Sequence, residues 1–139
     1  MAKHCETFEH TADVGLAARA DTLGGLFEAL AEGLADYICS RRSVRADRTR
    51  PVAVGAEDVE ALAVDFLWEV MTAIQAGRFM VAAARVKEMS DTAIAAELAG
   101  EPYDPARHEL KTEVKGVTYH QLKIAREGEQ WIGRVILDL

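Results

Sequence analysis

The 139-residue sequence predicts an α+β fold in a single domain, residues 1–139: a mostly antiparallel or mixed β-sheet with two long helices packed on one face. Two stretches repeat apolar residues every three or four positions, as amphipathic helices do. Most other ordered stretches alternate apolar and polar residues, as strands do, and short turns separate them. The second half lacks a regular strand–helix–strand alternation, which argues against a doubly wound sheet.

The N-terminal third predicts two strands and a helix. Residues 6–10 are extended, and residues 14–20 alternate, with Val14, Leu16, Ala18 and Ala20 on one face. Asp21-Thr22 offers a side-chain cap for the helix. Its apolar stripe consists of Leu23, Leu26, Phe27, Leu30, Leu34 and Ile38.

The middle of the chain begins with its only basic run, Arg41, Arg42, Arg45, Arg48 and Arg50. We expect a solvated loop over residues 40–49, or else a contact for phosphate or for an acidic patch. Residues 51–54 predict an edge strand, because Pro51 lacks an N–H. A heavily buried helix then follows Gly55 and stops near Gly77; its buried face carries Val59, Leu62, Ala63, Phe66, Leu67, Val70, Met71 and Ile74.

From Arg78 onward the apolar period changes from 3.6 to 2. Residues 79–89 and 92–98 predict two strands, and residues 100–108, with two prolines, predict a loop. A further strand places its even-numbered residues from Thr112 to Ile124 on one face. The last strand, residues 130–139, turns Asp138 to the side of Ile132, Arg134 and Ile136.

The charge, the cysteine spacing, the hydropathy and the absence of certain motifs argue against several classes of function. The formal net charge of -7 argues against a free-standing nucleic-acid binder but allows docking onto a basic partner. Cys5 and Cys39 match no zinc or disulfide spacing, which favours a reducing cytoplasm. No apolar run is long enough to span a membrane, and the first residues are too polar for a signal peptide. We find no phosphate-binding glycine loop and no GxSxG motif, so a nucleotide enzyme acting alone is poorly supported.

The stretch FEHTADVGL, residues 8–16, places His10, Thr11 and Asp13 in a dense polar turn between two strands. Asp13 and His10 are either structural turn residues or half of a functional site. Asp138 has apolar neighbours, so we expect it to be poorly solvated. Two carboxylates brought together repel unless a cation joins them, and oxygen donors suit Mg²⁺, Ca²⁺ or Mn²⁺. His10 would extend the choice to softer divalent metals.

Lys115, Tyr119 and His120 form a second candidate set. In an uninterrupted strand Lys115 and Tyr119 share one face, whereas His120 points to the other. They line one pocket only if a bulge intervenes. The alternative is an exposed Lys115 beside a half-buried Tyr119.

Several motifs, in order along essentially the whole chain, resemble the archease family. They are FEHTADVGL, the DTL and LFEA segments of the first helix (residues 21–29), VDFL (residues 64–67), Glu101 with Asp104, Arg107 and His108, EVKGVTYH (residues 113–120) and the final RVILDL. Two positions depart from the family pattern: Gly116 replaces an alanine, and Trp68 replaces an asparagine of the second helix.

The resemblance implies an accessory protein, not an enzyme, that activates the GTP-dependent tRNA-splicing RNA ligase. That ligase joins a 2′,3′-cyclic phosphate or 3′-phosphate to a 5′-hydroxyl, and the accessory protein promotes guanylylation of the ligase's histidine and multiple turnover. By position, Asp13 and Asp138 are the implied metal ligands, and His10, Lys115 and His120 orient the site or face the ligase. The implied cofactor is a divalent ion (Ca, Mg or Mn), GTP is used by the ligase, and tRNA is met only indirectly.

Two alternatives stay open at this stage. One is a chaperone or modulator of tRNA-modifying enzymes such as methyltransferases. The other is a small metal-dependent hydrolase that uses His10 and Asp13. The lack of a second acid–base set on the same face argues against this alternative.

Overall fold

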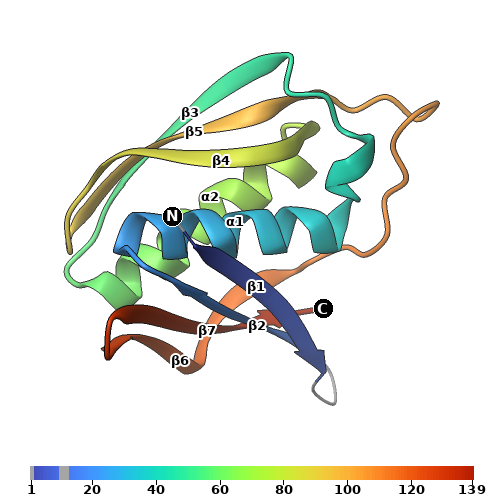
Figure 1. Ribbon diagram of the computed structural model, residues 1–139. Coiled ribbons are helices and arrows are strands. Elements are labelled where there is room, and N and C mark those ends of the chain that lie inside the picture. The colour runs from blue at the N-terminus through green and yellow to red at the C-terminus, as the bar shows by residue number, and fades with distance from the viewer. Residues whose placement is uncertain (1, 10–12) are drawn as a thin grey trace.

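The structure is a computed structural model that describes residues 2–9 and 13–139 (Figure 1). Within these residues the chain forms, in order, β1 (Lys3–Glu9), β2 (Asp13–Ala20), α1 (Leu23–Ile38), a short 3₁₀ helix (Arg41–Ser43), β3 (Arg48–Gly55), α2 (Val59–Gln75), β4 (Phe79–Met89), β5 (Ala93–Pro102), β6 (Gly116–Glu127) and β7 (Gln130–Asp138).

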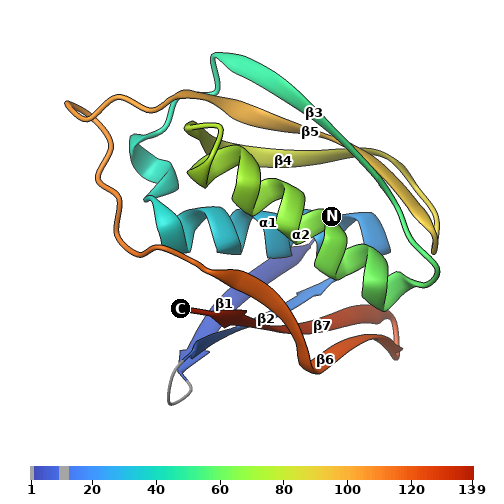
Figure 2. The same cartoon turned by 180° about the vertical axis from the view of Figure 1, so that it is seen from behind.

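The described strands form two antiparallel sheets with the helices between them (Figures 1 and 2). The four-stranded sheet has the order β1-β2-β7-β6, and the three-stranded sheet has the order β3-β5-β4. The predicted α+β class and antiparallel pairing are confirmed. Each sheet carries the helices on one face, as expected, but the strands divide into two sheets because the helices need apolar cover on both sides.

Local sequence explains both helices. The Thr22 hydroxyl accepts a hydrogen bond from the Gly25 N–H at 3.0 Å and caps α1, and Asp58 caps α2 in the same way through the Ala61 N–H at 2.8 Å. The predicted apolar stripes are buried except at their first residues, Leu23 and Val59, which are partly buried. The Phe27 and Phe66 rings, with centroids 5.7 Å apart, pack the two helices together. No helix in the described ranges is both long and apolar enough to cross a membrane.

The outer edge of β4 is bonded to side chains of α1 and of the short 3₁₀ helix that follows it. The backbone N–H groups of Ala84 and Val86 donate to the carboxylates of Glu32 (3.0 Å) and Glu28 (2.8 Å). The Arg41 guanidinium donates to the Ala82 carbonyl at 2.7 Å. Side chains therefore satisfy backbone groups that a neighbouring strand satisfies elsewhere in a sheet.

Several details differ from the sequence predictions. β1 begins at Lys3 and not at residue 6, and β6 begins at Gly116 and not at Thr112. The edge strand begins at Arg48, so only the first part of the basic run lies outside regular strand structure, and residues 41–43 form a 3₁₀ turn. β5 continues through Pro102, because residues 100–102 pair with β4. In β6 the alternation predicted up to Ile124 is wrong, since an irregularity lies between Thr118 and Lys123.

Candidate functional site

Asp13 and Asp138 lie directly opposite each other where β2 begins and β7 ends. The register is fixed by the core, because Val14 pairs with Leu137 and Leu16 pairs with Val135, and these side chains are buried. A slip of one residue would turn each buried set toward solvent. Directly opposite residues share a face of the sheet, with Cβ atoms about 4.5–5.5 Å apart. The hydrophobic alternation thus brings two carboxylates together from the two ends of the sequence.

The two aspartates differ in exposure. Asp13 is partly exposed and Asp138 is exposed. The expectation that Asp138 would be poorly solvated is therefore wrong, because it lies at the end of its strand and on the face away from the helices. What favours a cation at this place is the pairing of two carboxylates in a solvent-accessible position.

The residues that lead into β6 complete this corner of the sheet. The Lys115 N–H donates to the Asp138 carbonyl at 2.8 Å, and Gly116 pairs with Asp138. Lys115 is exposed. The sheet order therefore places β2, β7 and the start of β6 side by side, with Asp138 in the middle (Figure 2).

A wide bulge interrupts β6 just beyond this corner. Thr118 pairs with Ile136 and Lys123 pairs with Arg134, so residues 119–122 stand opposite Val135 alone. Gln121 adopts a left-handed backbone with φ 54°, and the bulge presents Tyr119 and His120 to solvent. A bulge was the condition for Lys115, Tyr119 and His120 to share one surface, and a bulge is present. Tyr119 is 60% exposed, so it is not the half-buried residue of the alternative.

Gly116 and Trp68 lie in contact with each other. A Cβ added to Gly116 would lie 3.1 Å from Cζ2 of Trp68 and 3.3 Å from its Cη2. The Trp68 indole N–H donates to the Val117 carbonyl at 3.1 Å. The absent methyl at residue 116 thus makes room for the larger ring at residue 68. The sequence alone did not suggest this relation, because the two residues lie on different elements.

The donor chemistry of the aspartate pair fits a hard divalent cation. Both side chains offer only oxygen, and such cations take several carboxylate, carbonyl and water oxygens. His10 lies outside the described residues. Among the residues that are described, no group of three or more His, Cys, Asp or Glu side chains is arranged to hold a metal ion.

A second polar cluster is centred on Glu101, which is 5% exposed. Arg107 approaches both of its oxygens, at 2.7 and 2.5 Å, and the Arg45 N–H donates to it at 2.7 Å. Arg107 also lies 3.3 Å from the Asp104 carboxylate. The hydrogen bonds from Arg107 and Arg45 hold the pKa of Glu101 well below its usual value. The cluster fastens the chain after β5 to the segment before β3.

His108 belongs to the same cluster, and its imidazole is buried. The Asp104 backbone N–H donates to its Nδ1 at 2.9 Å, so Nδ1 is an acceptor. The proton is therefore on Nε2, which donates to Glu101 at 3.0 Å. With every polar atom of the ring engaged and the side chain buried, His108 supports the loop and is closed to a substrate.

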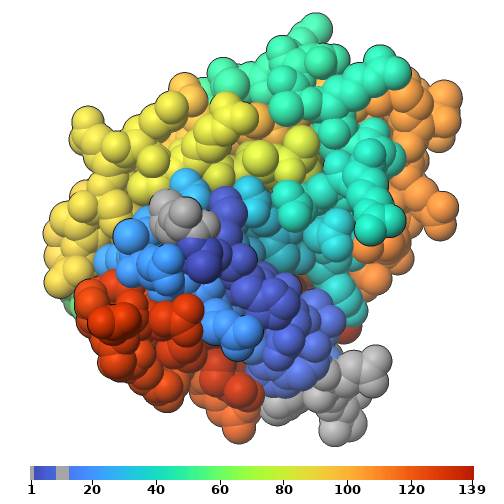
Figure 3. All heavy atoms as spheres, in the orientation of Figure 1, coloured from blue at the N-terminus to red at the C-terminus, as the bar shows by residue number. Residues whose placement is uncertain are grey.

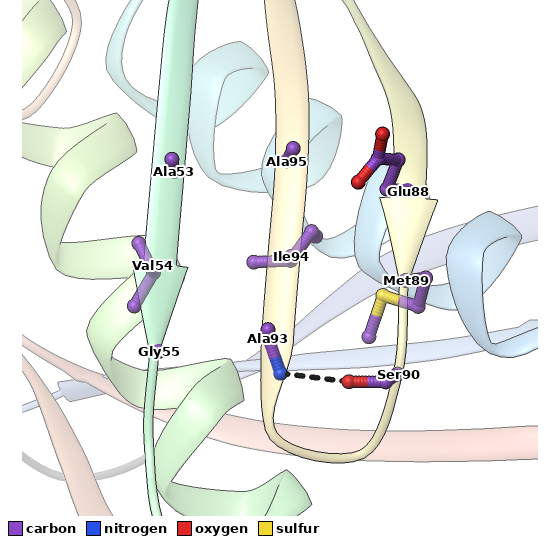
Figure 4. Close-up of a pocket in the computed structure, with 9 residues that line it drawn as sticks. All are labelled: Ala53, Val54, Gly55, Glu88, Met89, Ser90, Ala93, Ile94 and Ala95. Atoms are coloured by element: carbon purple, nitrogen blue, oxygen red, sulfur yellow. Dashed lines mark hydrogen bonds between the residues drawn. The ribbon is translucent and has the colours of Figure 1, made fainter.

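The depression at the β4–β5 turn and the two cysteines offer no chemistry that competes with the aspartate pair. A depression of about 470 Å³ lies on the three-stranded sheet at the β4–β5 turn, and Glu88 is the one charged side chain among its nine lining residues (Figure 4). The β4–β5 turn and the C-terminal end of the chain lie at opposite ends of the molecule (Figures 1 and 2). Cys39 is buried, and burial raises the pKa of the Cys5 thiol to about 12, which disfavours thiolate chemistry there.

Comparison with known proteins gives one consistent relation. The sequence model described as the Archease protein family matches residues 5–139. The chain is 35% identical to a protein of Pyrococcus abyssi named "Protein archease", over 99% of each sequence. It is 32% identical to the protein of that name from Methanosarcina acetivorans, over 99% of this chain and 97% of the relative.

Solved structures show the same fold. The solution structure of Methanobacterium thermoautotrophicum protein 1598 has a TM-score of 0.80 and 29% identity, and covers 97% of this chain and 98% of that one. The crystal structure of a Thermotoga maritima protein, described as an archease and possible chaperone, has a TM-score of 0.63 and 20% identity. This second match covers 96% of each chain and supports the fold alone.

Proposed function

Because the chain belongs to the archease family, we propose that it is an accessory protein that activates a GTP-dependent tRNA-splicing RNA ligase. The observation that carries this proposal to particular residues is the direct pairing of Asp13 with Asp138 across β2 and β7. In this proposal the protein is not itself the enzyme. It promotes guanylylation of the ligase's histidine and thereby permits repeated turnover.

Asp13 and Asp138 would hold a divalent cation, Ca²⁺, Mg²⁺ or Mn²⁺. When bound, such a cation supplies positive charge to the triphosphate of the GTP that the ligase uses. Asp138 is exposed and Asp13 is partly exposed, so a partner can reach the Asp138 side of the pair, which supports a site completed by another protein.

Lys115, His120 and His10 are proposed to face the ligase or to orient this site. Lys115 is exposed, and its backbone N–H donates to the Asp138 carbonyl, so the residue lies beside Asp138. His120 is exposed on the bulge two strands from Asp13. The net charge of -7 favours association with a basic, RNA-handling partner, and contact with tRNA is then indirect.

Ligation assays with Asp13→Asn and Asp138→Asn test the proposal. The substrate is a pair of RNA ends, a 2′,3′-cyclic phosphate and a 5′-hydroxyl, with GTP, a divalent ion and purified ligase. We expect the wild-type chain to raise multiple-turnover ligation, and each variant to lose most of this effect and to bind Mn²⁺ or Ca²⁺ at least about tenfold more weakly. Asp21→Asn, an exposed aspartate at the far end of β2, serves as the matched control.

The outcomes separate the alternatives. Full activation by both variants would refute the metal site. Hydrolysis by the chain without any ligase would favour a metal-dependent hydrolase. Increased recovery of an unfolded tRNA methyltransferase, with no effect on ligation, would favour a chaperone or modulator of tRNA-modifying enzymes.

A further inference from the structure

β6 is an edge strand of the four-stranded sheet, and α2 lies beside it (Figure 2). The Gln75 side-chain amide makes two hydrogen bonds to one residue just before β6. Its nitrogen donates to the Val114 carbonyl and its oxygen accepts from the Val114 N–H, both at 2.8 Å. A neighbouring strand would form the same pair of bonds, so Gln75 stands in for that strand at residue 114.

Trp68 makes the next such contact, through its indole N–H to the Val117 carbonyl at 3.1 Å. Trp68 and Gln75 are seven residues apart on α2, which is about 10.5 Å along a helix. Val114 and Val117 are three residues apart, which is about 10 Å along a strand. Because the two spacings match, a straight helix bonds an extended segment at both points.

Lys115 and Gly116 lie between these two bonded positions. They are also the residues that meet Asp138, through the 2.8 Å bond from the Lys115 N–H and through the pairing of Gly116. The segment is therefore held on one side by α2 and on the other by the last residues of β7. Val114, buried against the core, prevents rotation of the segment about its axis.

We infer that Gln75 and Trp68 are positioning residues for the aspartate pair: they fix residues 114–117, and through the Lys115 N–H they fix Asp138 opposite Asp13. This inference rests on the proposed metal site for its functional meaning. The order it imposes on the backbone does not require a metal. Trp68 occupies the helix position where the archease pattern has asparagine, so in this chain the indole N–H supplies one of the contacts.

Amide hydrogen exchange on the metal-free chain tests the positioning itself. Gln75→Leu removes both bonds to Val114, and we expect the Lys115 amide to exchange at least about tenfold faster relative to the Val135 amide in the core of the same sheet. Trp68→Phe keeps an aromatic ring beside Gly116 but removes the indole N–H that bonds the Val117 carbonyl. The increase in exchange rate that it causes should centre on Val117. Glu69→Leu, on the exposed side of α2 next to Trp68, is the control and should leave these ratios unchanged.

Two readouts keep the test falsifiable if Gln75→Leu lowers overall stability. A general loss of stability raises the exchange rates of the Lys115 and Val135 amides alike. If the ratio of these two rates is the same in Gln75→Leu as in the wild-type chain, the inference is overturned. Gln75→Glu keeps the acceptor for the Val114 N–H and should give an intermediate ratio, as partial rescue.

Calorimetric titration with Mn²⁺ or Ca²⁺ then connects the positioning to the site. We expect the wild-type chain and Glu69→Leu to bind equally, and Gln75→Leu to bind about tenfold more weakly. Equal affinity in Gln75→Leu, with Lys115 loosened, would overturn the inference and leave the proposed function intact. Failure of the wild-type chain to bind either ion would refute the metal site, while the exchange ratios would still decide whether α2 orders residues 114–117.

Discussion

At the scale of single residues, the most informative side chains are the buried ones whose polar atoms all form hydrogen bonds. Glu101 is buried and accepts hydrogen bonds from Arg107, Arg45 and His108. The motif containing Glu101, Asp104, Arg107 and His108 therefore has a structural explanation, since it joins the chain after β5 to the segment before β3. A charged motif read from sequence does not show whether its members face a ligand or one another.

The depressed pKa of Glu101 predicts how stability depends on pH. A carboxyl group whose pKa is lower in the folded than in the unfolded chain stabilises the fold above its unfolded pKa, about 4.3, and this contribution is lost as pH falls through the folded value. Urea unfolding should find Glu101→Gln less stable than wild type at pH 7, with the difference shrinking steadily below about pH 4.3. Glu97→Gln removes an exposed ion pair with Lys87 on the same strand and should show almost no difference. A constant gap between wild type and Glu101→Gln down to pH 2 would contradict the assignment.

At the scale of elements, β6 departs furthest from its sequence pattern. Its even-numbered residues change faces across the bulge: Thr118 pairs with Ile136 on the outer side, whereas Ile124 pairs with Gly133 on the helix side. Extra residues in one strand shift the phase of alternation, and nothing in a period-2 pattern marks where this happens. The bulge exposes Tyr119 and His120, and the straight segment before it carries the contacts with α2 and β7.

The contact between Trp68 and Gly116 predicts non-additive mutations. In the wild-type chain Gly116→Ala places a methyl about 3.1 Å from the ring, and overpacking of this kind costs about 1 kcal/mol or more. With Trp68→Asn the space is free, and the same Gly116→Ala should be neutral or stabilising by about 0.5 kcal/mol, because glycine weakens a strand. A double-mutant cycle measured by urea unfolding should give a coupling energy of about 1 kcal/mol or more. Glu69→Asn with Gly116→Ala is the reference pair and should be additive, so additivity in both cycles would refute the contact.

At the scale of the whole molecule, polar side chains join the two sheets across α1. Glu28 and Glu32 accept from backbone N–H groups of β4, and the Lys3 ammonium of β1 lies 3.1 and 3.4 Å from the same two carboxylates. In the space-filling view β1 lies at the surface, with β4 on one side and the C-terminal strands on the other (Figure 3). At one edge of each sheet, along β4 and beside β6, side chains from the helical segments therefore form hydrogen bonds with backbone groups, as a neighbouring strand would.

Removing Glu32 should open the β4 edge. Ala84 is buried, so Glu32→Ala leaves its N–H without an acceptor at a cost of about 1–3 kcal/mol. Glu32→Gln keeps an acceptor oxygen and loses the ion pairs with Lys3 and Arg41, both of which are partly exposed, so it should cost less than Glu32→Ala, about 1 kcal/mol or less. Hydrogen exchange should accelerate at the Ala84 amide in Glu32→Ala more than at the Val86 amide, which Glu28 still holds. Equal stability of the two variants would contradict this explanation.

The sequence by itself determined the two capped helices, the alternating strand that ends at Ala20 and the faces of the last strand, because each depends on periodicity within one element. It also determined the family, through motifs in a fixed order. Tertiary structure alone decided the division into two sheets, the bulge in β6, the burial of His108 and the pairing of Asp13 with Asp138. Periodicity shows which face of an element is apolar, whereas these features depend on which elements meet and in what register, and that is set when distant apolar faces pack against one another.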